Sequence, residues 1–223
     1  MDPRELRPGF WRWLARHPDW RREEGGATGW QPDVACFAWE GPDALVLFDP
    51  LISDEGGWRW LDGLVGRHDG PLVVAITLQW HHRSGNEVAQ RYGNSRPVEV
   101  WAHEAGARPW PYPITHEFEG DGELPGGVRA LAIDPVRAEV AYWIEAARTL
   151  VVGDALLGAE GERSATLRVM PTSWLVGDVS ASELVQGLER LTELPVELIV
   201  LAHGEPVASE ARERLREALD AAR

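Results

Sequence analysis

Lysine and cysteine are almost missing from this 223-residue sequence. No lysine occurs at all, so the positive side chains are arginines, which we attribute to the composition of the genome rather than to function. The one cysteine, Cys36, has no second thiol in the chain to pair with. An internal disulfide is therefore excluded, and the fold does not depend on oxidation. Cys36 stands in the alternating apolar segment VACFAW, which is typical of a small core residue rather than a nucleophile.

Long apolar runs and net positive charge are also lacking. No stretch approaches the roughly 18 apolar residues that a membrane-spanning helix needs. The first residues lack the charged-then-apolar layout of a signal peptide, so we expect a cytoplasmic protein. The 22 arginines face 36 acidic residues, which leaves a net charge of −14 at pH 7. That charge repels nucleic acids and anionic membranes, so we expect neither as a partner.

The residues that are abundant indicate an ordinary globular chain. Hydrophobic residues make up 44% of it and charged residues 26%. This length and composition predict a single domain over residues 1–223 with a well-buried core. The 12 tryptophans predict large interior rings or a pocket lined by aromatic side chains.

The segment Pro71–Gly93 carries the strongest local pattern. Leu72–Ile76 is a continuous β-branched apolar run, which predicts a strand buried on both faces. A polar and aromatic segment follows, and then Ser84 and Glu87 have the S-x-x-E spacing that predicts a helix beginning near Gly85. A loop between a buried strand and a capped helix often carries function.

The rest of the chain predicts an alternation of strands and helices. Near the N-terminus we expect a helix from Asp2 to about Pro18, and a loop over Leu51–Trp60. A second S-x-x-E pair, Ser180 and Glu183, predicts another helix. Three strand pairs are expected: residues 34–39 with 45–48, 115–118 with 128–133, and 139–144 with 149–152. We also expect a short strand for 98–102, a buried strand for 195–202 and a final helix for 208–222.

Four segments, taken in order, resemble the metallo-β-lactamase superfamily. LVLFDP ends in Asp49, Thr77 precedes the motif position, LVVGDALLG contains Asp154, and LIVLAHGEPV contains His203. The resemblance implies an α/β fold of four layers, an αβ/βα sandwich with two sheets face to face and helices outside. It also implies that these polar residues converge on one cleft.

The family's H-x-H-x-D-H motif falls on residues that mostly differ from it. Its metal-binding positions correspond to Leu78, Trp80, His82 and Arg83. Leu78 and Trp80 cannot bind a metal, so we expect them to be buried as pocket walls where the family has its histidine pair. The region of the family's third histidine offers only Asp134. The first metal position is therefore predicted to be lost.

The second metal position retains a coherent set. His82 takes the place of the motif's aspartate, and with Asp154 and His203 it would supply two imidazoles and a carboxylate. Such a set binds one divalent metal, Zn, Fe or Mn, and leaves a position open for water, whose pKa on zinc falls to about 7. Each residue also has an ordinary interpretation: a loop histidine, a turn aspartate and a strand-end histidine.

Arg83 leaves two functions open. It occupies a metal-ligand position of the motif, where its positive charge would repel a metal. It also stands just before a helix N-terminus, so it could turn outward to bind an anionic group. A salt bridge to Asp49 or Asp154 is the alternative. One hypothesis is a hydrolase that acts on a small ester, thioester, lactone or amide with one metal ion. The other is a metal-free relative of the fold that binds a small anionic ligand through Arg83.

Overall fold

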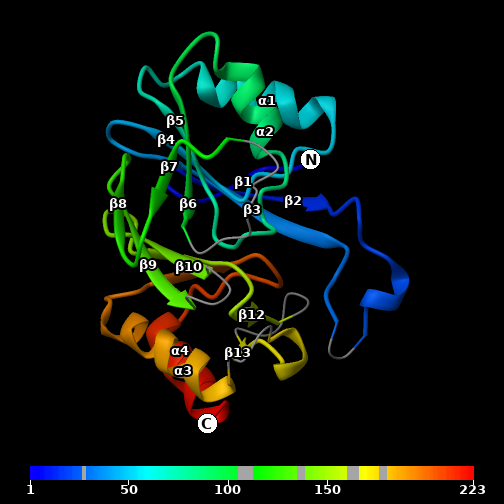
Figure 1. The fold of residues 1–223 in the computed structure, drawn as a ribbon, viewed down its shortest axis with the longest axis vertical. Coiled ribbons are helices and arrows are strands. Elements are labelled where there is room, and N and C mark those ends of the chain that lie inside the picture. The colour runs from blue at the N-terminus through cyan, green and yellow to red at the C-terminus, as the bar shows by residue number, and fades with distance from the viewer. Residues whose placement is uncertain (27–28, 105–112, 135–138, 160–165, 176–179) are drawn as a thin grey trace.

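The computed structural model describes residues 1–26, 29–104, 113–134, 139–159, 166–175 and 180–223; the side chain of Asp134 lies outside the described part. Two β-sheets lie face to face in the middle of the molecule, with helices on both outer sides (Figure 1). No helix among the described residues is long and apolar enough to cross a membrane.

The larger sheet has seven strands in sequence order. They are β1 (Arg4–Arg7), β2 (Phe10–Arg16), β3 (Asp33–Glu40), β4 (Leu45–Phe48), β5 (Leu72–Ala75), β6 (Val98–His103) and β7 (His116–Phe118). The pairs from β1 to β4 are antiparallel, whereas β4, β5, β6 and β7 run parallel. All four residues of both β4 and β5 are buried, as their uninterrupted apolar runs predict for strands covered on both faces.

The smaller sheet has five strands in the order β14, β11, β10, β9 and β8. Their bounds are β14 (Leu198–Leu201), β11 (Thr149–Val152), β10 (Glu139–Ile144), β9 (Val128–Asp134) and β8 (Gly122–Leu124). The pair β11–β14 is parallel and the others are antiparallel. A separate ribbon of two strands, β12 (Leu156–Gly158) and β13 (Leu167–Val169), follows β11.

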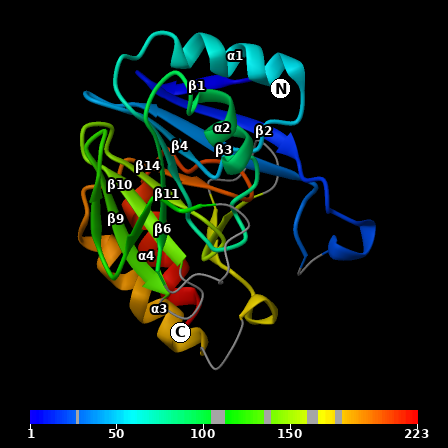
Figure 2. The ribbon, with the colours of Figure 1, turned by 45° about the horizontal axis from the view of Figure 1, so that its top comes forward.

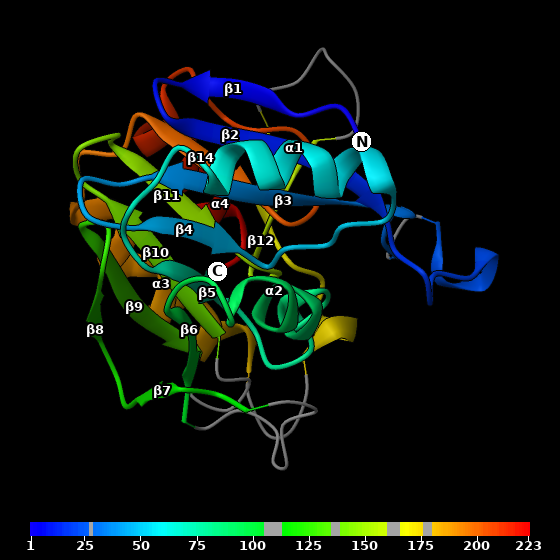
Figure 3. The same ribbon diagram turned by 90° about the horizontal axis from the view of Figure 1, so that it is seen from above.

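Helices cover the outer face of each sheet, which gives the predicted four-layer αβ/βα sandwich (Figures 2 and 3). α1 (Glu55–Val65) and α2 (Gly85–Tyr92) pack on the larger sheet, and α3 (Ala181–Glu189) and α4 (Ala211–Ala221) pack on the smaller one. Between the sheets lies an aromatic and aliphatic layer that includes Phe48 and Tyr142, whose ring centroids are 5.4 Å apart. Each fully buried side chain of this kind stabilises the fold by roughly 1.5–3 kcal/mol. Short 3-10 helices lie at Arg22–Glu24, Thr172–Trp174 and Arg190–Glu193.

The predicted N-terminal helix is wrong, because this segment forms β1 and β2. Phe10, Trp13 and Ala15 are buried, and β2 pairs along its whole length with β3. The turn between the two strands contains Gly9 at φ +74°, a conformation that L side chains rarely adopt. Pairing with β3, whose partner residues lie 17 to 29 positions further along the chain, overrode the local helix signal.

Two other segments differ from the expectation. The predicted loop Leu51–Trp60 contains the start of α1, where the Asp54 carboxylate accepts the N–H of Gly57 at 2.7 Å and so caps the helix. The strands predicted as a hairpin, 115–118 and 128–133, belong to different sheets: β7 joins β6, and β9 pairs with β8 and β10. The remaining predicted pairs, β3–β4 and β10–β11, are confirmed.

The parallel strands bring the polar segments to one edge. Asp49 follows β4 and Thr77 and His81 follow β5 in the larger sheet; Asp154 follows β11 and His203 follows β14 in the smaller one. Because parallel strands end at the same edge of a sheet, each sheet presents its polar residues at its carboxyl edge. The two edges meet, so the site lies between the two halves of the sandwich.

Candidate functional site

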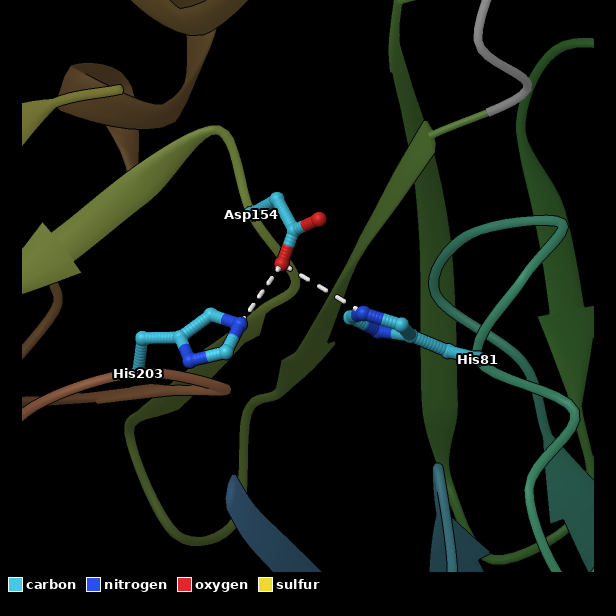
Figure 4. A group of neighbouring side chains, drawn as sticks. All are labelled: His81, Asp154 and His203. Atoms are coloured by element: carbon cyan, nitrogen blue, oxygen red, sulfur yellow. Dashed lines mark ion pairs between the residues drawn. The ribbon is translucent and has the colours of Figure 1, made fainter. Parts of the chain in front are cut away.

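His81, Asp154 and His203 form a compact cluster at the meeting of the two sheets (Figure 4). Asp154 lies in the middle: its Oδ1 is 3.3 Å from Nε2 of His81 and 3.4 Å from Nε2 of His203. One ligand atom from each of the three residues lies within 4.8 Å of the other two. His81 and Asp154 are buried, and His203 is partly buried. The cluster therefore presents two imidazole nitrogens and a carboxylate oxygen to a common point.

The orientation of His81 depends on Asp49, which lies behind it. Nδ1 of His81 is 3.0 Å from Oδ2 of the Asp49 carboxylate, so the opposite nitrogen, Nε2, faces Asp154. Asp49 is itself held by the backbone N–H of Thr77 at 2.8 Å and by the Thr77 hydroxyl at 2.5 Å. A carboxylate that is hydrogen-bonded to one imidazole nitrogen keeps the proton on that nitrogen and fixes the orientation of the ring.

The backbone around Asp154 is tightly enclosed. A Cβ at Gly153 would lie 2.7 Å from Thr77 Oγ1 and 3.0 Å from Glu139 Oε1, so only glycine fits before Asp154. Glu139 is fully buried, and its Oε1 accepts the N–H of Ala155 at 2.7 Å. The buried Glu139 carboxylate thereby holds the turn that carries Asp154.

Aromatic rings hold His203 in place. Trp30 and Trp174 both meet the imidazole edge-on, with ring centroids 5.6 Å and 5.8 Å from it. The residue after His203, Gly204, has φ +89°, and a Cβ there would lie 2.4 Å from the carbonyl oxygen of Gly158. The sharp turn at the end of β14 thus needs glycine, and it directs His203 back toward Asp154.

Opposite charges hold the cluster together. Burial and repulsion from Arg83 both lower the pKa of His81. Attraction to the carboxylates of Asp154 and Asp49 outweighs them and raises this pKa to about 9. Burial likewise opposes the charge of Asp154, yet the two imidazoles hold its pKa well below the usual range. In the absence of a metal, the buried carboxylate is therefore neutralised by an imidazolium.

The cluster forms part of the wall of a cavity of about 630 Å³. That volume is in the range of small-molecule sites. Its lining also includes His17, Asp19, Trp30, Trp80, His82, Arg83, Glu87 and Trp174. The cavity is thus large enough for a metabolite-sized ligand in direct contact with the cluster.

The structure brings His81, and not His82, to Asp154 and His203. The prediction of His82 rests on an extended conformation for residues 78–82, in which every second side chain shares a face. The chain instead turns: the N–H of His81 donates to the Leu78 carbonyl at 2.8 Å, and the N–H of Gly85 donates to the His82 carbonyl at 2.7 Å. The turn exchanges the directions of the two neighbouring histidines. His82 is half-buried and lines the cavity beside the cluster.

The two residues predicted as pocket walls, Leu78 and Trp80, differ in burial. Leu78 is fully buried, as expected for a residue that replaces a metal ligand. Trp80 was expected to be buried as well, but it is 41% exposed and its indole N–H donates to Asp154 Oδ2 at 3.4 Å. The turn at Leu78 directs this ring over the cavity instead of into the core.

Arg83 does not turn outward as predicted. Its Nη1 donates to the carbonyls of Ala35 and Asp49, both at 3.0 Å, and contacts the sulfur of Cys36 at 3.4 Å. The alternative that we considered, a salt bridge to the carboxylate of Asp49 or Asp154, is also absent from the ion pairs of the described residues. The residue has φ +40°, and its guanidinium is one of the groups that line the cavity.

Several residues that reach the site from distant segments have no signature in the sequence. His17 and Trp30 lie in irregular stretches and Trp174 ends a short 3-10 helix, with no motif around any of them, so only the abundance of tryptophan pointed to a pocket. Asp134, the candidate third ligand, has a side chain outside the described residues.

The donor set fits a divalent cation. Ligand bonds of about 2.0–2.1 Å in tetrahedral geometry place ligand atoms roughly 3.3–3.4 Å apart. The Asp154 oxygen lies at such distances from both Nε2 atoms. The carboxylate behind His81 is the partner that a metal-bound histidine normally has, whereas Nδ1 of His203 has no hydrogen-bond partner among the described residues.

Comparison with known proteins finds similarity in structure but not in sequence. No protein-family model and no curated protein matches the chain. Among solved structures, the DIM-1 metallo-β-lactamase superposes with a TM-score of 0.67 at 11% identity, over 100% of this chain and 98% of that one. A metallo-β-lactamase from Hirschia baltica gives a TM-score of 0.65 at 13% identity, over 98% and 97% of the two chains. A metallo-β-lactamase family protein from Thermus thermophilus gives 0.63 at 17% identity, over 97% and 80%.

Proposed function

Because this chain has the metallo-β-lactamase fold, we propose that it is a hydrolase that uses a single divalent cation, held by His81, Asp154 and His203. The substrate class is a small ester, thioester, lactone or amide. The observation that carries the proposal is the convergence of two imidazole nitrogens and one carboxylate oxygen, each from a segment that follows a different strand, on the wall of a cavity.

The chain's own residues prepare this site in several ways. A divalent cation at this position would polarise a carbonyl group and acidify water, which is the chemistry that hydrolysis needs. Asp49 keeps the proton of His81 on Nδ1 and leaves Nε2 as a donor atom. Trp30 and Trp174 hold the plane of the His203 ring.

A cation at the cluster must compete with a proton. Since the pKa of His81 is raised to about 9, this imidazole is protonated at neutral pH while no metal is bound. A protonated nitrogen cannot bind a metal, so binding releases a proton and strengthens as the pH rises.

A second candidate is a metal-free relative that binds a small anionic ligand. The observation in its favour is that the His81–Asp154 ion pair already neutralises the cluster, while Leu78 stands where the family has a metal ligand. The guanidinium of Arg83, which lines the cavity, would attract the anion.

Zinc titration by calorimetry, on protein purified without chelator and then stripped, distinguishes the two. We expect one zinc per chain for the wild type, loss of at least 100-fold in affinity for His81→Ala and His203→Ala, and little change for His82→Ala. The last variant is a matched control, because it removes the adjacent imidazole that lies outside the cluster. Wild-type binding weaker than micromolar, or equal binding by His203→Ala, would overturn the metal-dependent function and leave the anion-binding one.

A further inference from the structure

Trp80 is unusual among the tryptophans of the described residues. It and Leu14 are the large hydrophobic residues there that are exposed, each at 41%. Leu14 stands on β2 away from the cavity lining, and single exposed apolar residues of that kind are common. Trp80 lies instead on the wall of a cavity, where an exposed ring is a contact surface for a ligand.

Two further indoles surround the same cluster. Trp30 and Trp174 flank the His203 ring, and Trp80 reaches Asp154 through its N–H. All three line the cavity. They come from three segments that are far apart in the sequence, so a ligand beside the cluster meets flat aromatic surfaces from several directions.

The permanently charged side chains on the cavity wall are mainly acidic. Three carboxylates, Asp19, Glu87 and Asp154, line it together with the guanidinium of Arg83. One guanidinium does not offset three carboxylates, so the electrostatic field of the wall opposes a further negative charge. The cavity thus favours an uncharged group over an anionic one.

We infer that the cavity selects an uncharged substrate in which the hydrolysed bond adjoins a flat aromatic group, received by Trp80, Trp30 and Trp174. The hydrolytic step rests on the proposed function, whereas the binding preference does not. Stacking of aromatic pairs contributes beyond buried area, which gives the preference for a flat ring over a saturated one of the same size.

Three probes with one carbon skeleton test the inference: 1-naphthamide, its saturated analogue decahydronaphthalene-1-carboxamide, and 1-naphthoate. Calorimetry on chelator-treated protein measures their binding without hydrolysis or metal coordination. We expect 1-naphthamide to bind about three- to tenfold more tightly than the saturated amide, the range that aromatic pairing supplies. We also expect it to bind more tightly than 1-naphthoate, which has the same ring but carries a negative charge that the acidic wall opposes. Tighter binding of the saturated amide would overturn the aromatic preference, and tighter binding of naphthoate would overturn the preference for an uncharged substrate.

Variants of Trp80 test which surface is used. Trp80→Leu keeps apolar bulk but removes the ring, and we expect it to weaken 1-naphthamide about three- to tenfold while leaving the saturated amide unchanged. Trp80→Phe should retain affinity within about twofold. Trp58→Leu is the matched control, since Trp58 is partly buried on α1 and outside the cavity lining.

The results separate this inference from the proposed function. Unchanged naphthamide affinity in Trp80→Leu, with the fold verified by circular dichroism, would overturn the role of the ring. If the stripped protein binds 1-naphthamide as expected but takes up no zinc, the aromatic preference stands and the hydrolase proposal fails. Zinc uptake without discrimination among the probes would overturn the aromatic preference and leave the hydrolase proposal standing.

Discussion

Asp49 shows how a single residue determines the direction of a neighbour. It has φ +46°, and its carboxylate is held by the backbone and hydroxyl of Thr77 while it faces Nδ1 of His81. An amide in its place would still adopt this backbone conformation, because asparagine tolerates the left-handed region. It would, however, offer an N–H to at least one partner where an acceptor is needed.

We therefore expect Asp49→Asn to lower zinc affinity about 10- to 100-fold, the usual cost of losing the partner behind a metal-binding histidine. We also expect the free energy of unfolding to fall by about 1–3 kcal/mol, since a buried hydrogen bond is lost. Calorimetry and urea titration measure the two effects. Asp69→Asn, on the exposed surface, is the control and should change neither the zinc affinity nor the stability. A zinc affinity of Asp49→Asn within about twofold of the wild type would contradict the orienting role of Asp49.

At the scale of elements, two S-x-x-E pairs that look alike in sequence behave differently. At α3, Ser180 Oγ accepts the N–H of Glu183, and the Glu183 carboxylate accepts the N–H of Ser180 at 2.8 Å, which is a full capping box. At α2, the side chain of Ser84 does not cap the helix; its Oγ accepts the N–H of Ile52 at 3.1 Å. Glu87 lines the cavity instead.

The two glutamates should accordingly differ on substitution. We expect Glu183→Ala to lower the free energy of unfolding by roughly 0.5–1 kcal/mol, because one N–H at the start of α3 loses its acceptor. Glu87→Ala should leave stability unchanged within about 0.5 kcal/mol, as for most surface substitutions. Equal losses in parallel urea titrations would show that both pairs cap their helices in solution.

At the scale of the whole molecule, the cluster joins the two halves of the sandwich. His81 belongs to the half with the larger sheet and Asp154 to the half with the smaller one, so their ion pair is formed only when the sheets are packed together. The stability of the metal-free protein therefore depends on the charge of His81.

This dependence has a definite sign. Although burial opposes it, attraction to Asp154 raises the pKa of His81 from 6.5 to about 9, so the imidazolium stabilises the folded state fully below pH 6.5 and progressively less up to pH 9 and above. We expect the chelator-treated wild type to lose on the order of 3 kcal/mol of unfolding free energy over this range. His81→Gln should lack this loss. Urea titrations from pH 6 to 10 measure both, and parallel curves for the two proteins would refute the ion pair.

Much of the fold follows from the sequence alone. The buried strands β4, β5, β11 and β14 were predictable because short β-branched apolar runs have few alternatives, and their order resembled one fold. That Asp154 and His203 lie in one cluster was predictable, because each directly follows such a strand. The same local reasoning anticipated the capping box that begins α3.

Only the tertiary structure decided the rest. β2 became a strand because β3 offers it a full set of hydrogen bonds, which no local propensity reveals. His81 takes the place predicted for His82 because the chain turns after Leu78. In an extended chain the side chain of His82 would face Asp154, whereas in the turn the side chain of His81 does. Arg83 turned inward and Trp80 outward for the same reason. The direction of a side chain that follows a strand depends on its hydrogen-bond partners in distant segments. Here the partners of Arg83 are the carbonyls of Ala35 and Asp49, and the partner of Trp80 is the carboxylate of Asp154.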